Sequence, residues 1–260
     1  MTIHFGIYPS VGYCTYFDES KRRSIDLKTR PVNFNEIEKI ALMFEEIKSK
    51  INGKLGYVCI CLFENYGNEI RKNFIECGLK NGFENIEIIN LETAIYLNAM
   101  SQINYKPLNG NVIWIQYSEY FFVWEINNQK AKFCGMWNAD SSRLNELQKI
   151  VDESKLNKRV DVVLYHTKIA ESNMRKMSEC QCFYSVYDYW YSEGSLLKAR
   201  IIAGDSELTH LETTYFLSRT FSLKIGNNVI TSFQKTQQLP IFYTTTINKD
   251  PKNDTLKVVR

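Results

Sequence analysis

Short apolar runs alternate with helix-period stripes along most of the chain. Residues 3–8, 12–17 and 24–27 have the apolar, β-branched character of strands. Asn33 follows as a capping residue, with Glu36 three positions later. The apolar residues after it recur every three or four positions, namely Phe34, Ile37, Ile40, Ala41, Phe44, Ile47 and Ile51. This spacing predicts an amphipathic helix that packs one face against a sheet.

The same succession of elements is predicted twice. In the first half, strands over 57–62 and 86–89 alternate with helices over 67–79 and 92–100. The second half begins with new strands, and its predicted elements are strands 112–116, 121–126 and 130–133, helix 141–154, strand 162–165, helix 168–177, strand 183–186 and helix 194–203. Alternating strands and helices favour a mostly parallel α/β layer. A duplicated ribonuclease-H-like unit is the simplest interpretation, although no residue-level repeat is visible.

The helical pattern stops after Gly204-Asp205. Strand-like segments then cover 216–225, 229–233, 241–246 and 256–259, with turns at 226–228 and 249–251. We therefore expect a boundary near 206–213. The predicted organisation is an α/β region over 1–205, with lobe one at about 1–105 and lobe two at about 106–205, and an all-β segment over 206–260.

Composition argues against several classes of function. A hydrophobic content of 44% and a charged content of 23% are typical of a globular protein with a substantial core. The net charge of +3 is too small to indicate nucleic-acid binding. No apolar run approaches the roughly 18–20 residues of a membrane span, and no signal peptide is visible, so we expect neither membrane nor secretion. Seven cysteines without a disulfide-like framework are consistent with a cytoplasmic protein.

The cysteines also raise an alternative, a zinc site built from Cys59-x-Cys61 and Cys180-x-Cys182. Both pairs lie in strand-like sequence, where residues two apart point the same way and behave as small core residues. Structural zinc sites more often use a C-x₂₋₄-C spacing. His4, His166 and His210 have no partner at ligand or catalytic spacing. We therefore predict no metal.

Residues 88–97, IINLETAIYL, resemble the I-I-N-E-P-T-A-A-A-L run of DnaK-type chaperones, the seventy-kilodalton heat-shock family. Further segments match the family in the same order. They are Gly6 to Tyr8, Glu64-Asn65, 153–158, 162–164, 194–205, Phe216 to Val229 and 235–240. The resemblance implies an actin-like two-lobed ATPase fold of duplicated ribonuclease-H-like units. Gaps at 27–33 and at about 136–143 imply that both outer subdomains are missing, and the tail resembles half of the family's β substrate domain.

The resemblance also implies that the nucleotide site is degenerate. At the first phosphate loop the family's Asp, Gly and two Thr correspond to Tyr8, Ser10, Val11 and Gly12. The second loop corresponds to 116–119, begins at Gln116 and contains no glycine, although phosphate-binding loops need close backbone approach. Leu91 stands for the family's Glu, and His166 lies in a shortened adenosine loop. We expect no catalysis and no ATP cofactor; the alternative is weak residual ATP binding through Ser10, Glu92 and Glu119.

The half-length β segment predicts a protein partner, because half a sandwich leaves strand edges and an apolar face uncovered. The residues expected at that surface are Phe221, Leu223, Val229, Ile230, Phe242 and Tyr243. The resemblance is to the atypical chaperone of the ribosome-associated complex, which pairs with a J-domain protein. The expected function is a catalytically inactive co-chaperone or scaffold subunit, with a J-domain protein and, indirectly, the ribosome as partners. The alternatives are a free peptide-binding module and a minimal ATPase.

Overall fold

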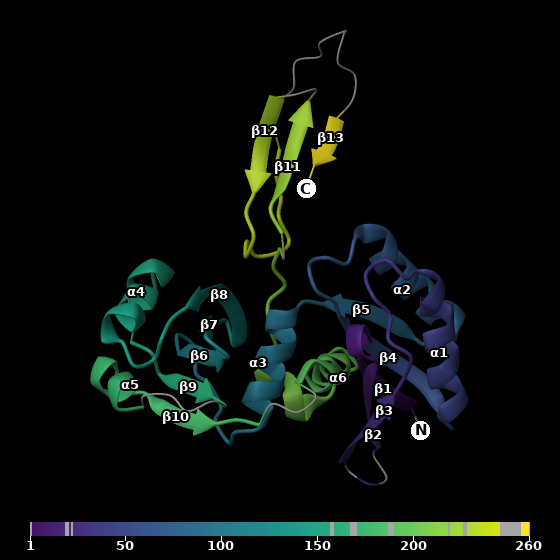
Figure 1. Cartoon of the computed structure of the whole chain (residues 1–260), viewed down its shortest axis with the longest axis horizontal. Coiled ribbons are helices and arrows are strands. Elements are labelled where there is room, and N and C mark those ends of the chain that lie inside the picture. Colours follow the sequence, from purple (N-terminus) through teal and green to yellow (C-terminus); the bar gives the residue numbers. More distant parts are fainter. Residues whose placement is uncertain are drawn as a thin grey trace.

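The computed structural model describes residues 2–18, 21, 23–156, 159–166, 171–186, 190–217, 219–225, 228–244 and 256–259. Two five-stranded sheets form two lobes, and a three-stranded sheet projects away from both (Figure 1). Lobe one contains β1 (Thr2–Tyr8), β2 (Tyr13–Asp18), β3 (Arg23–Lys28), α1 (Glu38–Lys50), β4 (Lys54–Cys61), α2 (Asn68–Lys80), β5 (Asn85–Ile89) and α3 (Leu91–Ser101).

Lobe two has the same succession. Its elements are β6 (Val112–Tyr117), β7 (Tyr120–Asn127), β8 (Lys130–Asn138), α4 (Leu144–Ser154), β9 (Val162–Tyr165), α5 (Glu171–Met177), β10 (Gln181–Tyr184) and α6 (Trp190–Ile202). The predicted elements of 1–205 are therefore present, with ends that differ by a few residues. The first helix begins later than predicted, at Glu38, because Asn33 and Glu36 instead form a turn, in which the Asn33 amide donates to Glu36 Oε2 at 2.9 Å.

The two sheets share one topology. The first has the order β3-β2-β1-β4-β5, and the second, taken from its other edge, has the order β8-β7-β6-β9-β10. In both, the first three strands are antiparallel and the last two join in parallel. The predicted duplicated ribonuclease-H-like unit, and with it the two-lobed actin-like fold, is confirmed. The connections from β3 to α1 and from β8 to α4 are short, so no outer subdomain is inserted at either of these equivalent points.

Each lobe is completed by the other lobe's last helix. Helix α3 ends the first unit, but its side chains pack in the core of lobe two, where the Tyr96 and Trp124 rings lie 4.6 Å apart. Helix α6 ends the second unit and packs against β1 and β4 of lobe one (Figure 1). Residues 92–100 of α3 are all buried, as expected of a helix that is apolar on every side.

The chain leaves lobe two through the short 3₁₀ helix η2 (Ser206–Leu211) and a strap, which we define as residues 212–217. Leu211 and Phe216 belong to the core of lobe two, and Thr213 pairs in parallel with Ala131 near the beginning of β8. Residues 206–216, which the sequence analysis grouped with the β segment, thus pack with the lobes.

The projecting sheet consists of β11 (Phe221–Ile225), β12 (Asn228–Phe233) and β13 (Leu256–Val259), in the order β12-β11-β13. The strand predicted over 216–225 is shorter than expected, because its first residues belong to the strap. The strand predicted over 241–246 is not found in residues 241–244, and positions 245 and 246 lie outside the described residues. Few contacts attach the sheet; one is the Arg219 guanidinium, which donates to the Tyr66 carbonyl at 3.0 Å.

Candidate functional site

The two strand-ending turns at the lobe junction are equivalent in the duplicated units. Tyr8 ends β1 and begins the turn into β2, and Tyr117 ends β6 and begins the turn into β7. These are the positions that the resemblance assigns to the two phosphate loops. Both tyrosines contact Tyr191 in the first turn of α6, with ring centroids 4.7 Å and 6.2 Å away respectively. The structure therefore brings the two predicted loops together.

The junction is filled with aromatic side chains. Phe63, which follows β4, packs edge-on against Tyr8 at 5.6 Å, and His166, which follows β9, stacks on Tyr117 at 6.1 Å. The Tyr191 hydroxyl donates to the Tyr117 hydroxyl at 2.5 Å. We call these five residues the junction cluster: Tyr8, Phe63, Tyr117, His166 and Tyr191. The cluster links lobe one to lobe two through the ring contacts of Tyr8 and Phe63 with Tyr191.

The electrostatics of the junction cluster disfavour charge. Burial raises the pKa of Tyr8, and burial together with Tyr117 raises that of Tyr191 well above its usual range. Burial also lowers the pKa of His166 to about 4, so this imidazole is neutral at pH 7. The cluster itself contains no carboxylate. Metal-assisted phosphoryl transfer uses carboxylates and close backbone donors around the phosphates, and this cluster offers phenols, a phenyl ring and a neutral imidazole in their place.

The other residues of the turn between β1 and β2 either stabilise the turn itself or point away from the junction cluster. Gly12 has φ 71°, and a Cβ there would lie 2.2 Å from the Thr29 carbonyl oxygen. A glycine is therefore required here, both for the left-handed backbone conformation of the turn and for its close contact with the backbone at Thr29. Val11 is exposed. The Ser10 hydroxyl oxygen is buried beside Tyr8. The four positions of lobe one at which the phosphate loop was predicted to be degenerate thus form or flank a short 3₁₀ helix, Pro9–Val11.

The remaining predicted positions are divided between the lobes. Leu91 opens α3 and packs in the core, and Gln116 is buried, where its amide donates to the Ser118 carbonyl. Glu92 is buried, which raises its pKa, and lies 4.0 Å from the Lys235 ammonium. Glu119 is exposed on the second turn. Ser10, Glu92 and Glu119, the candidates for residual ATP binding, therefore differ widely in environment.

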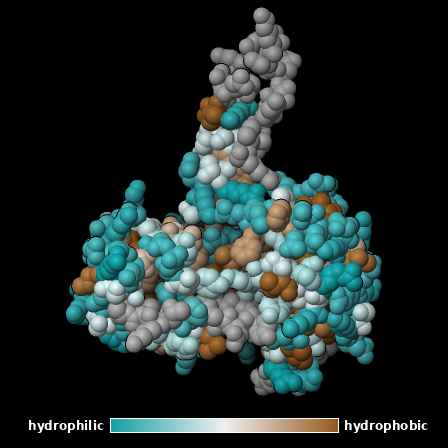
Figure 2. Space-filling model, in the orientation of Figure 1, coloured by the Kyte–Doolittle hydropathy of each residue, from teal (hydrophilic) through white to brown (hydrophobic). Residues whose placement is uncertain are grey.

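The predicted partner-binding residues lie on or beside the projecting sheet. Phe242 is 90% exposed and Val229 is 55% exposed. Phe221, Leu223 and Ile230 are partly buried within the sheet. Tyr243 packs edge-on against Phe233 at 5.7 Å and remains 44% exposed. Figure 2 shows this segment standing clear of the two lobes, whose surface is mostly hydrophilic in this view.

The cysteine pairs do not meet. Cys59 and Cys61 lie in the central strand β4 of lobe one, and burial raises the pKa of both thiols. Cys180 and Cys182 lie at β10, the edge strand of lobe two, with their sulfurs 3.8 Å apart. In the described ranges, no three His, Cys, Asp or Glu side chains are grouped so that they could hold a metal ion.

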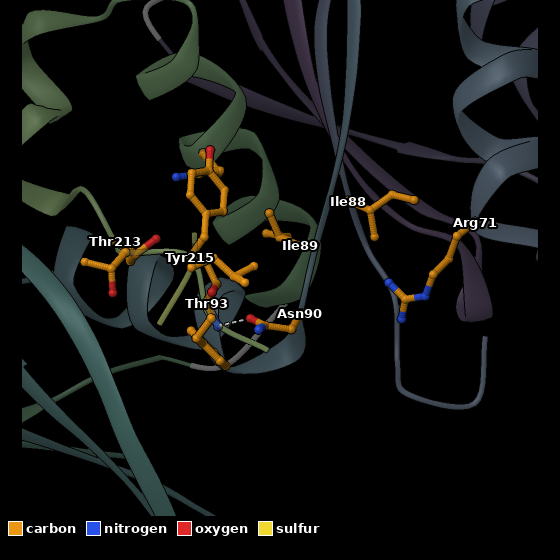
Figure 3. Close-up of a pocket in the computed structure, with 11 residues that line it drawn as sticks. Arg71, Ile88, Ile89, Asn90, Thr93, Thr213 and Tyr215 are labelled. Carbon is orange, nitrogen blue, oxygen red and sulfur yellow. Dashed lines mark hydrogen bonds between the residues drawn. The ribbon is translucent and has the colours of Figure 1, made fainter. Parts of the chain in front are cut away.

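A cavity of about 150 Å³ lies where the strap meets lobe one (Figure 3). Tyr215 and Thr213 of the strap line it together with Asn90 and Thr93 at the start of α3, and Ile88 and Arg71 lie across from them. Lys198 of α6 also lines it. The sequence analysis did not identify this cavity, although one signal was present: Lys198 interrupts an otherwise small and apolar run, Leu196 to Ala199.

The fold defines a class, the actin-like two-lobed proteins. Several solved structures show weak similarity to this chain. One is a Bacteroides thetaiotaomicron protein with an actin-like ATPase fold and unknown function, 10% identical, with TM-score 0.42, covering 77% of this chain and 95% of that one. Another is the ethanolamine utilization protein EutJ from Carboxydothermus hydrogenoformans, 8% identical, with TM-score 0.40 and coverages of 75% and 88%. A Ppx/GppA family member from Aquifex aeolicus is 14% identical, with TM-score 0.38 and coverages of 64% and 66%.

No protein-family model and no curated sequence matches the chain. The fold assignment therefore rests on the repeated strand order of the two sheets. Across the described residues, none of the helices combines the length and the apolar character needed to span a membrane.

Proposed function

We propose that this protein is a catalytically inactive, DnaK-like scaffold or co-chaperone subunit that binds a protein partner through its projecting sheet. The junction cluster is the observation that supports the proposed lack of catalytic activity. Tyr8 and Tyr117 occupy the two turns that the resemblance assigns to phosphate binding, and both contact Tyr191. A phosphate placed between these turns would have to displace buried aromatic rings and break the Tyr191–Tyr117 hydrogen bond, and no carboxylate of the cluster would hold its metal.

The proposed binding of a protein partner is supported by the projecting sheet. Its outer strands, β12 and β13, have one side without a partner strand among the described residues. Unpaired strand edges with exposed apolar side chains are recognised by β-augmentation, in which a partner adds a strand. A J-domain protein at the ribosome is the partner that the resemblance favours, and assistance to nascent-chain folding is the process.

Titration with Mg-ATP tests the inactive site. A ligand that binds the native state raises the melting temperature in proportion to the logarithm of its concentration. We expect Mg-ATP to leave the melting temperature unchanged up to millimolar concentrations, and we expect no phosphate release above background. A concentration-dependent rise would instead support the minimal-ATPase alternative.

Affinity purification from the native cytosol, followed by mass spectrometry, tests the scaffold. We expect a J-domain protein at a stoichiometric ratio together with ribosomal proteins, and we expect Phe242→Ser to weaken its recovery. Leu108→Ser is the matched control, because Leu108 is 72% exposed but lies in the loop between α3 and β6. Equal loss with both variants, or a monomer without a stoichiometric partner, would contradict the scaffold and favour a free peptide-binding module.

A further inference from the structure

We propose that the cavity at the base of the projecting sheet binds a small oxyanion, a phosphate or a carboxylate group, with the Lys198 ammonium as its counter-charge. The inference does not depend on the proposed function. It rests on a buried cation, on a helix end that lines the same cavity and on the size of that cavity.

Lys198 is the central observation. Its side chain is only 1% exposed, although it carries an ammonium group with three N–H donors. The ammonium lies 4.6 Å from the centre of the Tyr215 ring, a cation–π contact that supplies no hydrogen-bond acceptor. No hydrogen bond or ion pair joins Lys198 to another described residue. A buried charge without hydrogen-bonded partners is costly, so the cavity that Lys198 lines is where its donors can be satisfied.

The start of α3 adds a second favourable field. Asn90 caps this helix by accepting a hydrogen bond from the Thr93 amide at 3.0 Å, and both residues line the cavity (Figure 3). Helix N-termini carry partial positive charge and bind anions. Thr213, which is 2% exposed, and Thr214 also line the cavity.

The size of the cavity selects a small ligand. Its volume of about 150 Å³ is below the ~300 Å³ at which pockets for drug-sized ligands begin. The apolar side chains of Ile88, Ile89, Phe216 and Leu239 line the rest of it. A single phosphate or a short carboxylate fits this combination of size and charge better than a nucleotide does.

One carboxyl group lies near Lys198 without lining the cavity. Glu87 is on β5, opposite Cys59, and burial raises its pKa, while Lys198 and the Tyr215 hydroxyl act in the opposite direction. One of its oxygens is buried without a hydrogen bond among the described residues. Glu87 thus interacts with Lys198 electrostatically, but no hydrogen bond or ion pair joins the two side chains, so the hydrogen-bond donors of Lys198 remain available to a ligand.

Anion binding would also fix the projecting sheet. The cavity walls come from β5 and α3, from α6 of the other unit, and from the strap and Leu239, between which β11 and β12 leave and return. A ligand that contacts both sides would tie the strap to lobe one. Its binding energy would then stabilise the attachment of the sheet as well as the lobes.

The test is isothermal titration calorimetry on the full, unmodified chain with inorganic phosphate and separately with malonate, at constant ionic strength. We expect saturable binding of at least one. Phosphate alone would identify a phosphate site, and malonate alone a carboxylate site. If neither binds saturably, the proposal is overturned.

Variants locate the site. Lys198→Met keeps the chain length and removes the charge, so we expect its affinity to fall by at least about tenfold. Lys149→Met is the control, because the Lys149 side chain is 69% exposed on α4. Thr213→Val is isosteric and keeps Lys198, and it serves if Lys198→Met does not fold; we expect it to weaken binding. Unchanged affinity in whichever of Lys198→Met and Thr213→Val folds would overturn the assignment of the site.

Discussion

Two glycines determine how closely α6 approaches its neighbours. A Cβ on Gly6 of β1 would lie 1.9 Å from the Ser192 carbonyl oxygen, and one on Gly194 of α6 would lie 2.0 Å from the Ala94 carbonyl oxygen. Real side-chain carbons do not tolerate such distances from backbone atoms. The crossing of α6 over β1 and α3 therefore depends on the absence of a side chain at both positions.

Replacing Gly194 with alanine should destabilise the protein. The new methyl group would push α3 and α6 apart, and overpacking of this kind costs about 1–3 kcal/mol or more. Urea unfolding would measure the free energy of unfolding. Gly67→Ala is the control, because nothing lies within 4 Å of a Cβ there. Similar stability for the two variants would show that the helix crossing can relax.

Glu193 should make stability depend on pH. Burial, with a smaller contribution from Asp26, raises its pKa to about 6 from the ordinary glutamate value of 4.5. The folded state then binds this proton more tightly than the unfolded state, so the free energy of unfolding falls as pH rises from about 4.5 to about 6.

We accordingly expect Glu193→Gln to raise the free energy of unfolding at pH 7 by up to about 2 kcal/mol. The gain should shrink toward pH 4. Denaturant unfolding at several pH values measures both, and Glu45→Gln, at an exposed position of α1, is the control. A pH-independent difference would show that the effect is not one of charge burial.

Among the elements, the projecting sheet is the one least packed against the hydrophobic cores of the lobes. None of the residues of this sheet whose burial the structure describes belongs to the core clusters, which lie in the lobes and at their junction. Its attachments include the Arg219 hydrogen bond to Tyr66 and ion pairs of Lys235 with Glu64 and Glu92. The Lys235–Glu64 ion pair is exposed, and pairs of this kind contribute only about 0–1 kcal/mol, so this contact adds little to the attachment of the sheet.

Native-state hydrogen exchange should reveal this difference. We expect the amides of β11 and β12 to exchange through local opening, faster than those of the central strands β1 and β4, because segments with few buried apolar contacts open at lower free energy. Mass spectrometry of peptic fragments would measure it. Equal protection of all four strands in the isolated chain would argue that the sheet is already complete without a partner.

At the scale of the whole molecule, the exchange of α3 and α6 joins the lobes into one folding unit. The sheet of lobe one is covered by a helix that begins at Trp190, and the core of lobe two includes a helix that ends at Ser101. Neither half can bury its own sheet fully. The junction cluster adds ring contacts between them, from Tyr8 and Phe63 of the first half to Tyr191 of the second.

Fragment complementation tests this exchange. Residues 1–106 and 107–260, divided in the loop between α3 and β6, should each be largely unfolded alone and should form a native-like complex when mixed. Circular dichroism and size-exclusion chromatography would follow the association. Gly194→Ala in the second fragment should weaken it. Independent, stable folding of either fragment would contradict the interdependence of the lobes.

Local periodicity determined most of the secondary structure, and with it the repeated order from which the duplicated fold was predicted. It succeeded because a residue's spacing from its apolar neighbours decides which face of a helix or strand is buried. The family resemblance assigned the two phosphate loops to the turns that follow β1 and β6, and this assignment stays a prediction. Periodicity does not state what an apolar face packs against. The exchange of α3 and α6, the meeting of Tyr8 and Tyr117 at Tyr191, and the burial of Lys198 beside the strap all join residues far apart in the chain, so only the tertiary structure decided them.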